Sequence, residues 1–169
     1  GVKGFMLSMI ETAIRITDGN LAAEGTHQIL EIGKELLERP IEILPHVETV
    51  LETLSSKYRL VVATKGDLLD QERKLKKSGL AKYFHHIEIM SDKKSADYEK
   101  LIRHLDIAPS EFMMIGNSLK SDILPVLELG GHGVHIPFHT TWAHEMVGHP
   151  VEHVNFREIE HLDEILSFL

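Results

Sequence analysis

The sequence predicts an α/β domain that has a doubly wound parallel sheet and a small helical subdomain at its start. Short apolar runs alternate with helical patterns after Pro45, whereas residues 1–44 carry helical periodicity alone. Such alternation requires crossover connections between parallel strands, with helices covering both faces of the sheet. We therefore expect a helical part with its connector at 1–44 and an α/β core at 45–169.

The helical part is expected to form a hairpin of two helices. Apolar residues recur at a spacing near 3.6 residues over 5–14, and the turn 18–20 then interrupts the pattern. The second helix extends over about 26–38 and ends before Pro40. Pro40 and Pro45 bracket a stiff connector that separates the two parts of the chain.

The core is expected to contain strands separated by helices. Each strand is a short apolar run, and the helices show apolar residues at a spacing of three to four, except for the charged run 68–78 that precedes Gly79. The expected strands are 58–63, 86–90, 112–116 and 134–136, and the expected helices are 46–55, 68–78, 95–105, 123–129 and 162–168. Ser95 is the expected N-cap of its helix.

Composition excludes several classes of function. The 169 residues carry a net charge of −8, which argues against a nucleic-acid partner because phosphate backbones require a basic surface. The absence of cysteine excludes disulfides, zinc-thiolate sites and a cysteine nucleophile. With no apolar run long enough for a bilayer and no signal-peptide pattern, we expect a cytoplasmic protein without membrane contact. A small phosphorylated partner remains compatible, since a few lysines and backbone N–H groups can hold one phosphate.

Chemically suggestive residues directly follow three of the expected strands. In an open parallel sheet, ligands bind beyond the carboxyl ends of the strands. Thr64-Lys65-Gly66 offers a hydroxyl and backbone N–H groups to a phosphate oxygen. After the next strand, Lys93 or Lys94 offers a cation that can neutralise a phosphoryl group.

The third of these segments contains hard oxygen ligands. Asn117 and Asp122 follow the apolar strand that ends at Gly116, and such ligands suit Mg²⁺. Each segment alone also has a structural explanation: Thr64 can cap a helix, the lysines can be a solvated pair, and Asp122 can favour a helix N-terminus. An acidic site directly after a buried strand is, however, hard to explain by folding alone.

Taken in order, these segments resemble the haloacid dehalogenase-like (HAD) hydrolase superfamily, which has a Rossmann-like sheet and consists mostly of Mg²⁺-dependent phosphatases. The strand Val61-Val62-Ala63-Thr64 resembles the family's second motif, the lysine ahead of a helix its third, and Gly116-Asn117 with Asp122 its fourth. The likeness covers about 45–169, and the run from Met114 through Trp142-Ala143-His144-Glu145 is similar to one bacterial branch. The leading helices resemble part of the family's cap.

The resemblance implies roles for the matching residues. Thr64 and Lys93 are the expected catalytic residues, with Lys94 as the rival of Lys93. The expected phosphate-binding groups are Thr64, Lys93 and the N–H groups of Lys65 and Gly66. The expected Mg²⁺ ligands are Asp122 and Asn117.

Two features depart from the family's pattern. Asn117 stands where Asp is commoner, which leaves Asp122 as the expected direct ligand. The first motif, Asp-x-Asp after a central strand, occurs nowhere in the chain. That strand would lie between those ending at Thr64 and Gly116, and without it several backbone groups would lose partners at about 1–3 kcal/mol each, against a total stability of about 5–15 kcal/mol. We therefore expect the 169 residues to be a fragment whose upstream part carries this strand and the Asp pair.

The expected function is Mg²⁺-dependent hydrolysis of a small phosphorylated metabolite through an aspartyl-phosphate, with the nucleophile outside the 169 residues. The alternative is a HAD-like binding or regulatory module, which the missing Asp pair favours and Thr64, Lys93 and Asp122 oppose. The acidic loop and leading hairpin disfavour a receiver domain, and the metal site disfavours a dehalogenase. Among twelve histidines, His144 and His149 are five apart rather than the four that a zinc helix requires, and no role is assigned to any.

Overall fold

The computed structural model describes residues 1–138 and 150–169, so the run 142–145 of the expected resemblance lies outside the described residues. The described chain divides into two compact units, residues 1–42 with 67–79 and residues 43–66 with 80–169. The first unit therefore includes the helix expected at 68–78 in addition to most of the helical part. No helix within the described ranges combines the length and apolar character that crossing a membrane requires.

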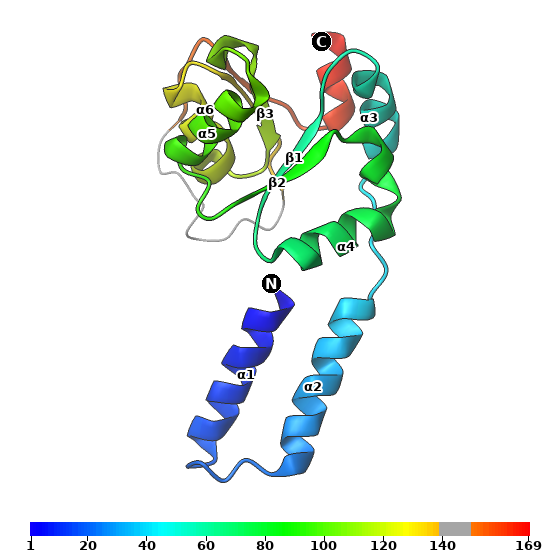
Figure 1. The fold of residues 1–169 in the computed structure, drawn as a ribbon, viewed down its shortest axis with the longest axis vertical. Coiled ribbons are helices and arrows are strands. Elements are labelled where there is room, and N and C mark those ends of the chain that lie inside the picture. Colours follow the sequence, from blue (N-terminus) through cyan, green and yellow to red (C-terminus); the bar gives the residue numbers. More distant parts are fainter. Residues whose placement is uncertain (139–149) are drawn as a thin grey trace. The chain divides into compact units, whose positions relative to one another are not determined.

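The first unit is helical. α1 (Val2–Ile16) and α2 (Ala23–Glu38) lie side by side as a hairpin, as the sequence predicts (Figure 1). Gly33 permits their close approach, because a Cβ atom at this position would collide with the side chain of Met6. The remaining helix of this unit, α4 (Leu68–Ser78), begins after Asp67. The Asp67 carboxylate accepts a hydrogen bond from the Asp70 N–H at 3.1 Å.

The strands of the second unit are all paired in parallel. β1 (Val61–Lys65) pairs with β2 (His86–Met90). β3 (Met113–Gly116), β4 (His132–His135) and β5 (Phe156–Glu158) form a separate sheet in that order. The carboxyl ends of the strands within each sheet therefore lie at one edge, where the sequence predicts the ligand site.

Hydrophobic clusters cover both faces of the second sheet. Met114 belongs to the cluster formed with α5 (Ser95–Leu105) and α6 (Leu124–Glu128). Met113 and Ile115 pack against the cluster formed with α3 (Val47–Ser55) and the 3₁₀ helix Leu162–Ser167. Because successive strand residues point to opposite faces, the two clusters lie on opposite sides, which confirms the predicted doubly wound α/β fold.

β3 shares both clusters with the segment 60–65, which contains β1, but β1 and β3 share no hydrogen bonds. Val61 and Ala63 pack on the same cluster as Met114, while Leu60 packs on the same cluster as Ile115. Among the described residues, each of these two strands has a single hydrogen-bonded neighbour. The sheet is therefore interrupted between β1 and β3, which is where the missing central strand is expected.

Two boundaries near the predicted site differ from expectation. β1 spans 61–65 rather than 58–63, because its ladder with β2 continues through Thr64 and Lys65. Ser95 is not the N-cap of α5. Lys94 precedes the helix and donates its N–H to the Asp97 carboxylate at 3.2 Å, while the Ser95 hydroxyl donates to Glu128.

The last third of the chain also departs from the predicted elements. The helix expected at 123–129 begins earlier, as a π-helical turn over Leu119–Ile123 that continues into α6. The strand expected at 134–136 is β4 at 132–135, and β5 was not expected because its three residues show no apolar alternation. The last helix is a 3₁₀ helix.

Tyr98 connects α5 to the π-helical turn. Its side chain is fully buried, and its hydroxyl donates a hydrogen bond to the Ser121 carbonyl at 3.0 Å. Burial raises the pKa of Tyr98, and the negative charges of Asp122 and Asp97 act in the same direction. The hydroxyl therefore stays protonated and serves as a donor.

We expect Tyr98→Phe to lower the free energy of unfolding by about 1–3 kcal/mol, because it removes a buried hydrogen bond. Tyr83→Phe is the matched control, since the Tyr83 hydroxyl donates to Glu48 at an exposed position and its loss should cost no more than about 0.5 kcal/mol. Urea denaturation measures both changes. Equal effects of the two substitutions would show that the Tyr98 hydroxyl contributes nothing beyond a surface contact.

Candidate active site

A largely buried ion pair lies at the carboxyl ends of the strands. Lys93 Nζ, from the turn after β2, lies 2.6 Å from Asp122 Oδ1, in the π-helical turn that follows β3. The two side chains are 11% and 7% exposed. The contact therefore joins the two sheets at the edge where the sequence predicts a phosphate and metal site.

The turn after β2 directs its two lysines differently. Lys93 adopts a left-handed backbone conformation with φ of 55°, which is strained for a residue with a Cβ atom. Lys94 instead pairs with Asp92 on the surface, where the two side chains are 75% and 61% exposed. The structure thus brings Lys93 to Asp122 and leaves Lys94 in solvent.

The loop after β3 holds the Asp122 carboxylate in place. Asp122 Oδ2 accepts a hydrogen bond from the Ser118 N–H at 3.1 Å. A Cβ atom at Gly116 would collide with this carboxylate, so only glycine allows the side chain to lie against the strand end. The Ser118 hydroxyl in turn accepts a hydrogen bond from the Ser121 N–H at 3.0 Å. π-Helical turns of this kind occur frequently at functional sites.

The side chain of Lys65 also enters this edge of the sheet. Its Nζ donates a hydrogen bond to Ser121 Oγ at 2.8 Å, one residue before Asp122. Sequence reasoning uses only the backbone N–H of Lys65, because the spacing does not show which face of β1 this residue occupies. Val61, Ala63 and Lys65 alternate along β1 and so share the face toward the α5 and α6 cluster.

Thr64 and Gly66 lie at the same strand end as Lys65. Thr64 Oγ1 donates to the carbonyl of Lys65 at 3.3 Å, rather than to a residue of the Asp122 loop. Gly66 has φ of 120°, a conformation that favours glycine. These two residues therefore belong to the end of β1, next to Lys65.

The residues at this edge fit a magnesium ion by their chemistry. Asn117 is exposed directly after β3, and Asp122 supplies a carboxylate from the same loop. Mg²⁺ commonly takes one or two carboxylates and completes its coordination with water and substrate phosphate. Among residues 1–138 and 150–169, no group of three His, Cys, Asp or Glu side chains is arranged to hold a metal by itself. A complete site would thus need further oxygen ligands.

Sequence reasoning did not find His135 and Glu158. His135 ends β4 with its Nδ1 at 2.7 Å from Glu158 Oε2 and its Nε2 at 3.2 Å from the carbonyl oxygen of Asn117. The contact between these two residues could not be predicted, because Glu158 lies on β5, a strand that the sequence did not predict. In the register of the sheet, Glu158 lies opposite His135. The position of His135 at the end of a short apolar strand was the one available sequence cue.

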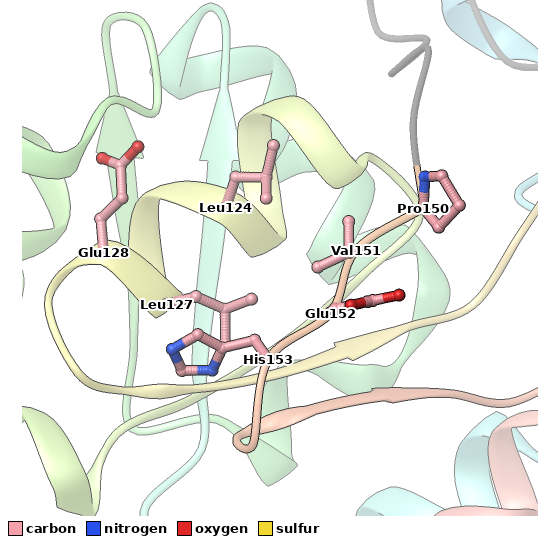
Figure 2. Close-up of a pocket in the computed structure, with 7 residues that line it drawn as sticks. All are labelled: Leu124, Leu127, Glu128, Pro150, Val151, Glu152 and His153. Carbon is pink, nitrogen blue, oxygen red and sulfur yellow. The ribbon is translucent and has the colours of Figure 1, made fainter.

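A separate hollow of about 590 Å³ opens beside α6 (Figure 2). Its lining consists of Leu124, Leu127, Glu128, Pro150, Val151, Glu152 and His153. None of the ion-pair and loop residues described above belongs to this lining. The candidate chemistry therefore lies at the strand ends rather than in this hollow.

The chain matches the family model of haloacid dehalogenase-like hydrolases over residues 1–130. It is similar to the crystal structure of a haloacid dehalogenase-like family hydrolase from Xanthomonas campestris, with 38% sequence identity and a TM-score of 0.83. That similarity covers 95% of this chain and 68% of the Xanthomonas chain.

More distant structures share the fold. A HAD phosphatase from Thermococcus onnurineus is 22% identical with a TM-score of 0.62, over 97% of this chain and 77% of its own. The putative HAD-hydrolase YfnB from Bacillus subtilis, bound to magnesium, is 14% identical with a TM-score of 0.66, over 98% of this chain and 78% of its own. No protein with a curated description matches the chain.

The two lysines after β2 provide a direct comparison. Lys93→Met removes the cation from a buried carboxylate and should lower the free energy of unfolding by about 3–5 kcal/mol. Lys94→Met removes an exposed ion pair with Asp92 and should change it by no more than about 1 kcal/mol. Chemical denaturation of both variants measures the difference, and similar losses would mean that the Lys93 pair is not buried as described.

Proposed function

Because this chain belongs to the haloacid dehalogenase-like hydrolase family, we propose that it forms part of a Mg²⁺-dependent phosphomonoesterase that acts on a small phosphorylated metabolite. The observation that carries this proposal is the buried pair of Lys93 and Asp122 at the strand ends. Burying two charges costs desolvation free energy that a pair of apolar side chains would not cost. A cation and a carboxylate held there are better explained by a ligand that needs both.

The anion-binding groups come from the ends of β1 and β2. The Thr64 hydroxyl and the N–H groups of Lys65 and Gly66 would hold the oxygens of the transferring phosphoryl group. Lys93 would supply the balancing positive charge, and it already lies at the same edge through its contact with Asp122. The Lys65 side chain, held by Ser121 at 2.8 Å, adds a second cation to this edge.

The loop after β3 would hold the metal. Asp122 and the side-chain oxygen of Asn117 are the proposed ligands, and Gly116 and the Ser118 N–H fix the direction of the carboxylate. When bound, Mg²⁺ would neutralise negative charge on the phosphoryl oxygens. Asn117 contributes a neutral oxygen, so Asp122 carries most of the electrostatic attraction for the cation.

The nucleophile would come from a strand between β1 and β3, outside the 169 residues. β1 and the residue before it, Leu60, pack on the same two hydrophobic clusters as β3, but β1 and β3 share no hydrogen bonds. A parallel strand between them would pair with both. An Asp at its end would attack phosphorus and form an aspartyl-phosphate while the P–O bond to the leaving group breaks. A second Asp would give its proton to the leaving oxygen and then take one from the water that hydrolyses the intermediate.

A binding or regulatory module is the second candidate function. The absence of any Asp-x-Asp in the 169 residues favours it specifically. A module of this kind would keep the lysines and Asp122 for binding a phosphate without turning it over. Binding of inorganic phosphate without hydrolysis of phosphate monoesters separates the two functions.

The test compares the natural polypeptide, with whatever sequence precedes these residues, with residues 1–169 alone. We expect the natural polypeptide to have an intact mass several kilodaltons above the 19.1 kDa of this chain and to hydrolyse p-nitrophenyl phosphate in the presence of Mg²⁺. Residues 1–169 alone should show no hydrolysis, and EDTA should abolish the activity of the longer protein. Magnesium-independent hydrolysis, or full activity of residues 1–169, would contradict the proposal.

Substitution of Asp122 tests the metal site within the natural polypeptide. Asp122→Asn should lower kcat/KM on the order of 100-fold and raise the Mg²⁺ concentration needed for half-maximal activity, because a charged ligand becomes neutral. Asp106→Asn, at the exposed C-terminal end of α5, is the matched control and should leave both values unchanged. Equal behaviour of the two variants would remove Asp122 from the site.

A further inference from the structure

Three adjacent strand ends are connected by the side chain of His135. In the register of the second sheet, His135 lies opposite Gly116 of β3 and opposite Glu158 of β5. The backbone ladder continues up to this point, since the Ile136 N–H donates to the Gly116 carbonyl at 3.0 Å. Beyond Gly116 the chain leaves the sheet, and the contact to the next carbonyl, that of Asn117, comes from the His135 ring.

The surroundings of His135 fix its ring at both nitrogens. The residue is 8% exposed, and its two ring nitrogens face the Glu158 carboxylate and the Asn117 carbonyl. A carbonyl oxygen only accepts hydrogen bonds, so Nε2 is the donor in the contact with Asn117. The Glu158 side chain is 55% exposed, so it contacts the ring from the solvent side. Its contact with Nδ1 fixes the orientation of the ring.

The peptide group between Asn117 and Ser118 is held from both sides. Its carbonyl oxygen lies 3.2 Å from His135 Nε2, and its N–H donates to Asp122 Oδ2 at 3.1 Å. A peptide unit is planar and rigid, so the direction of the carbonyl sets the direction of the N–H. The His135 ring thereby influences the Asp122 carboxylate without touching it.

We propose that His135, held by Glu158, is a positioning residue that aims the Asp122 carboxylate through the rigid peptide group of Asn117 and Ser118. The loop geometry is independent of the reaction, whereas the consequence for metal binding rests on the function proposed above. Groups that orient metal ligands typically change metal affinity by 10- to 100-fold when they are removed. His135 occupies this place although it contacts neither the expected ligand side chain of Asn117 nor Asp122.

The first measurement is amide hydrogen exchange of Ser118 in the natural polypeptide, resolved by NMR without metal. His135→Phe should accelerate exchange about tenfold, the effect of losing one net hydrogen bond. His135→Gln retains an N–H donor near the position of Nε2 and should restore protection to within about threefold. His132→Phe is the matched control on the same strand, because His132 Nε2 lies 3.2 Å from the Ser110 carbonyl, and it should leave Ser118 exchange unchanged.

The second measurement is the Mg²⁺ dissociation constant, obtained by titrating the same amide signals. His135→Phe should raise it about tenfold and His135→Gln much less, with kcat at saturating Mg²⁺ changing less than the metal affinity. If the wild-type protein binds no Mg²⁺ but His135→Phe accelerates Ser118 amide exchange as expected, the proposed function fails and the positioning role stands. If wild-type protein binds Mg²⁺ and Ser118 exchange is unchanged by His135→Phe, the positioning role is overturned alone.

A third variant covers the case in which His135→Phe does not fold. Glu158→Gln keeps the size of an exposed side chain and weakens its hold on Nδ1. It should accelerate Ser118 exchange by about two- to threefold, in the same direction as the larger change. Unchanged exchange in Glu158→Gln, with His135→Phe unfolded, would overturn the proposal.

Discussion

Lys93 and Asp122 meet 2.6 Å apart at the ends of two sheets that share no hydrogen bonds. Both side chains are largely excluded from water, so the loss of either would leave the other charge without its main compensation. Several costly local features serve this contact: the left-handed backbone of Lys93, the glycine at 116 and the π-helical turn that presents Asp122. Folding alone does not require these features at one place. Their coincidence at the carboxyl ends of parallel strands links the fold of the second unit to the chemistry proposed for it.

The α/β class and most of the elements follow from local sequence. The alternation of short apolar runs with helical patterns requires parallel strands and crossover helices, and β2 and α4 were predicted to the residue. The wrong predictions concern elements whose bounds or existence depend on tertiary contacts rather than on local sequence. β1 continues through Thr64 and Lys65 because β2 offers partners there. β5 is invisible to periodicity, since three residues with mixed polarity become a strand only when β4 pairs with them.

Part of the candidate site was also predictable, because local sequence patterns locate the ends of the strands. Lys93 and Asp122 stand directly after strands, and parallel strands end at one edge, so the sequence places them near each other. The choice between Lys93 and Lys94 depends on one backbone angle, which no sequence pattern shows. The side chain of Lys65 and the contacts of His135 depend on strand alternation and on the register with β5. The catalytic roles of these residues stay predictions until the proposed enzyme is assayed.

The interruption between β1 and β3 also bears on the tendency of separate copies of the protein to associate. A strand edge with free N–H and C=O groups is a template for any extended segment in a matching register. A segment tethered in the same polypeptide has a high effective concentration and wins this competition at ordinary protein concentrations. If these two edges stayed unpaired, strands from other copies would compete for them as concentration rises, and exchanged or fibrous assemblies would become accessible. A strand that paired with both edges would therefore protect the protein from such association, in addition to the chemical role proposed for it.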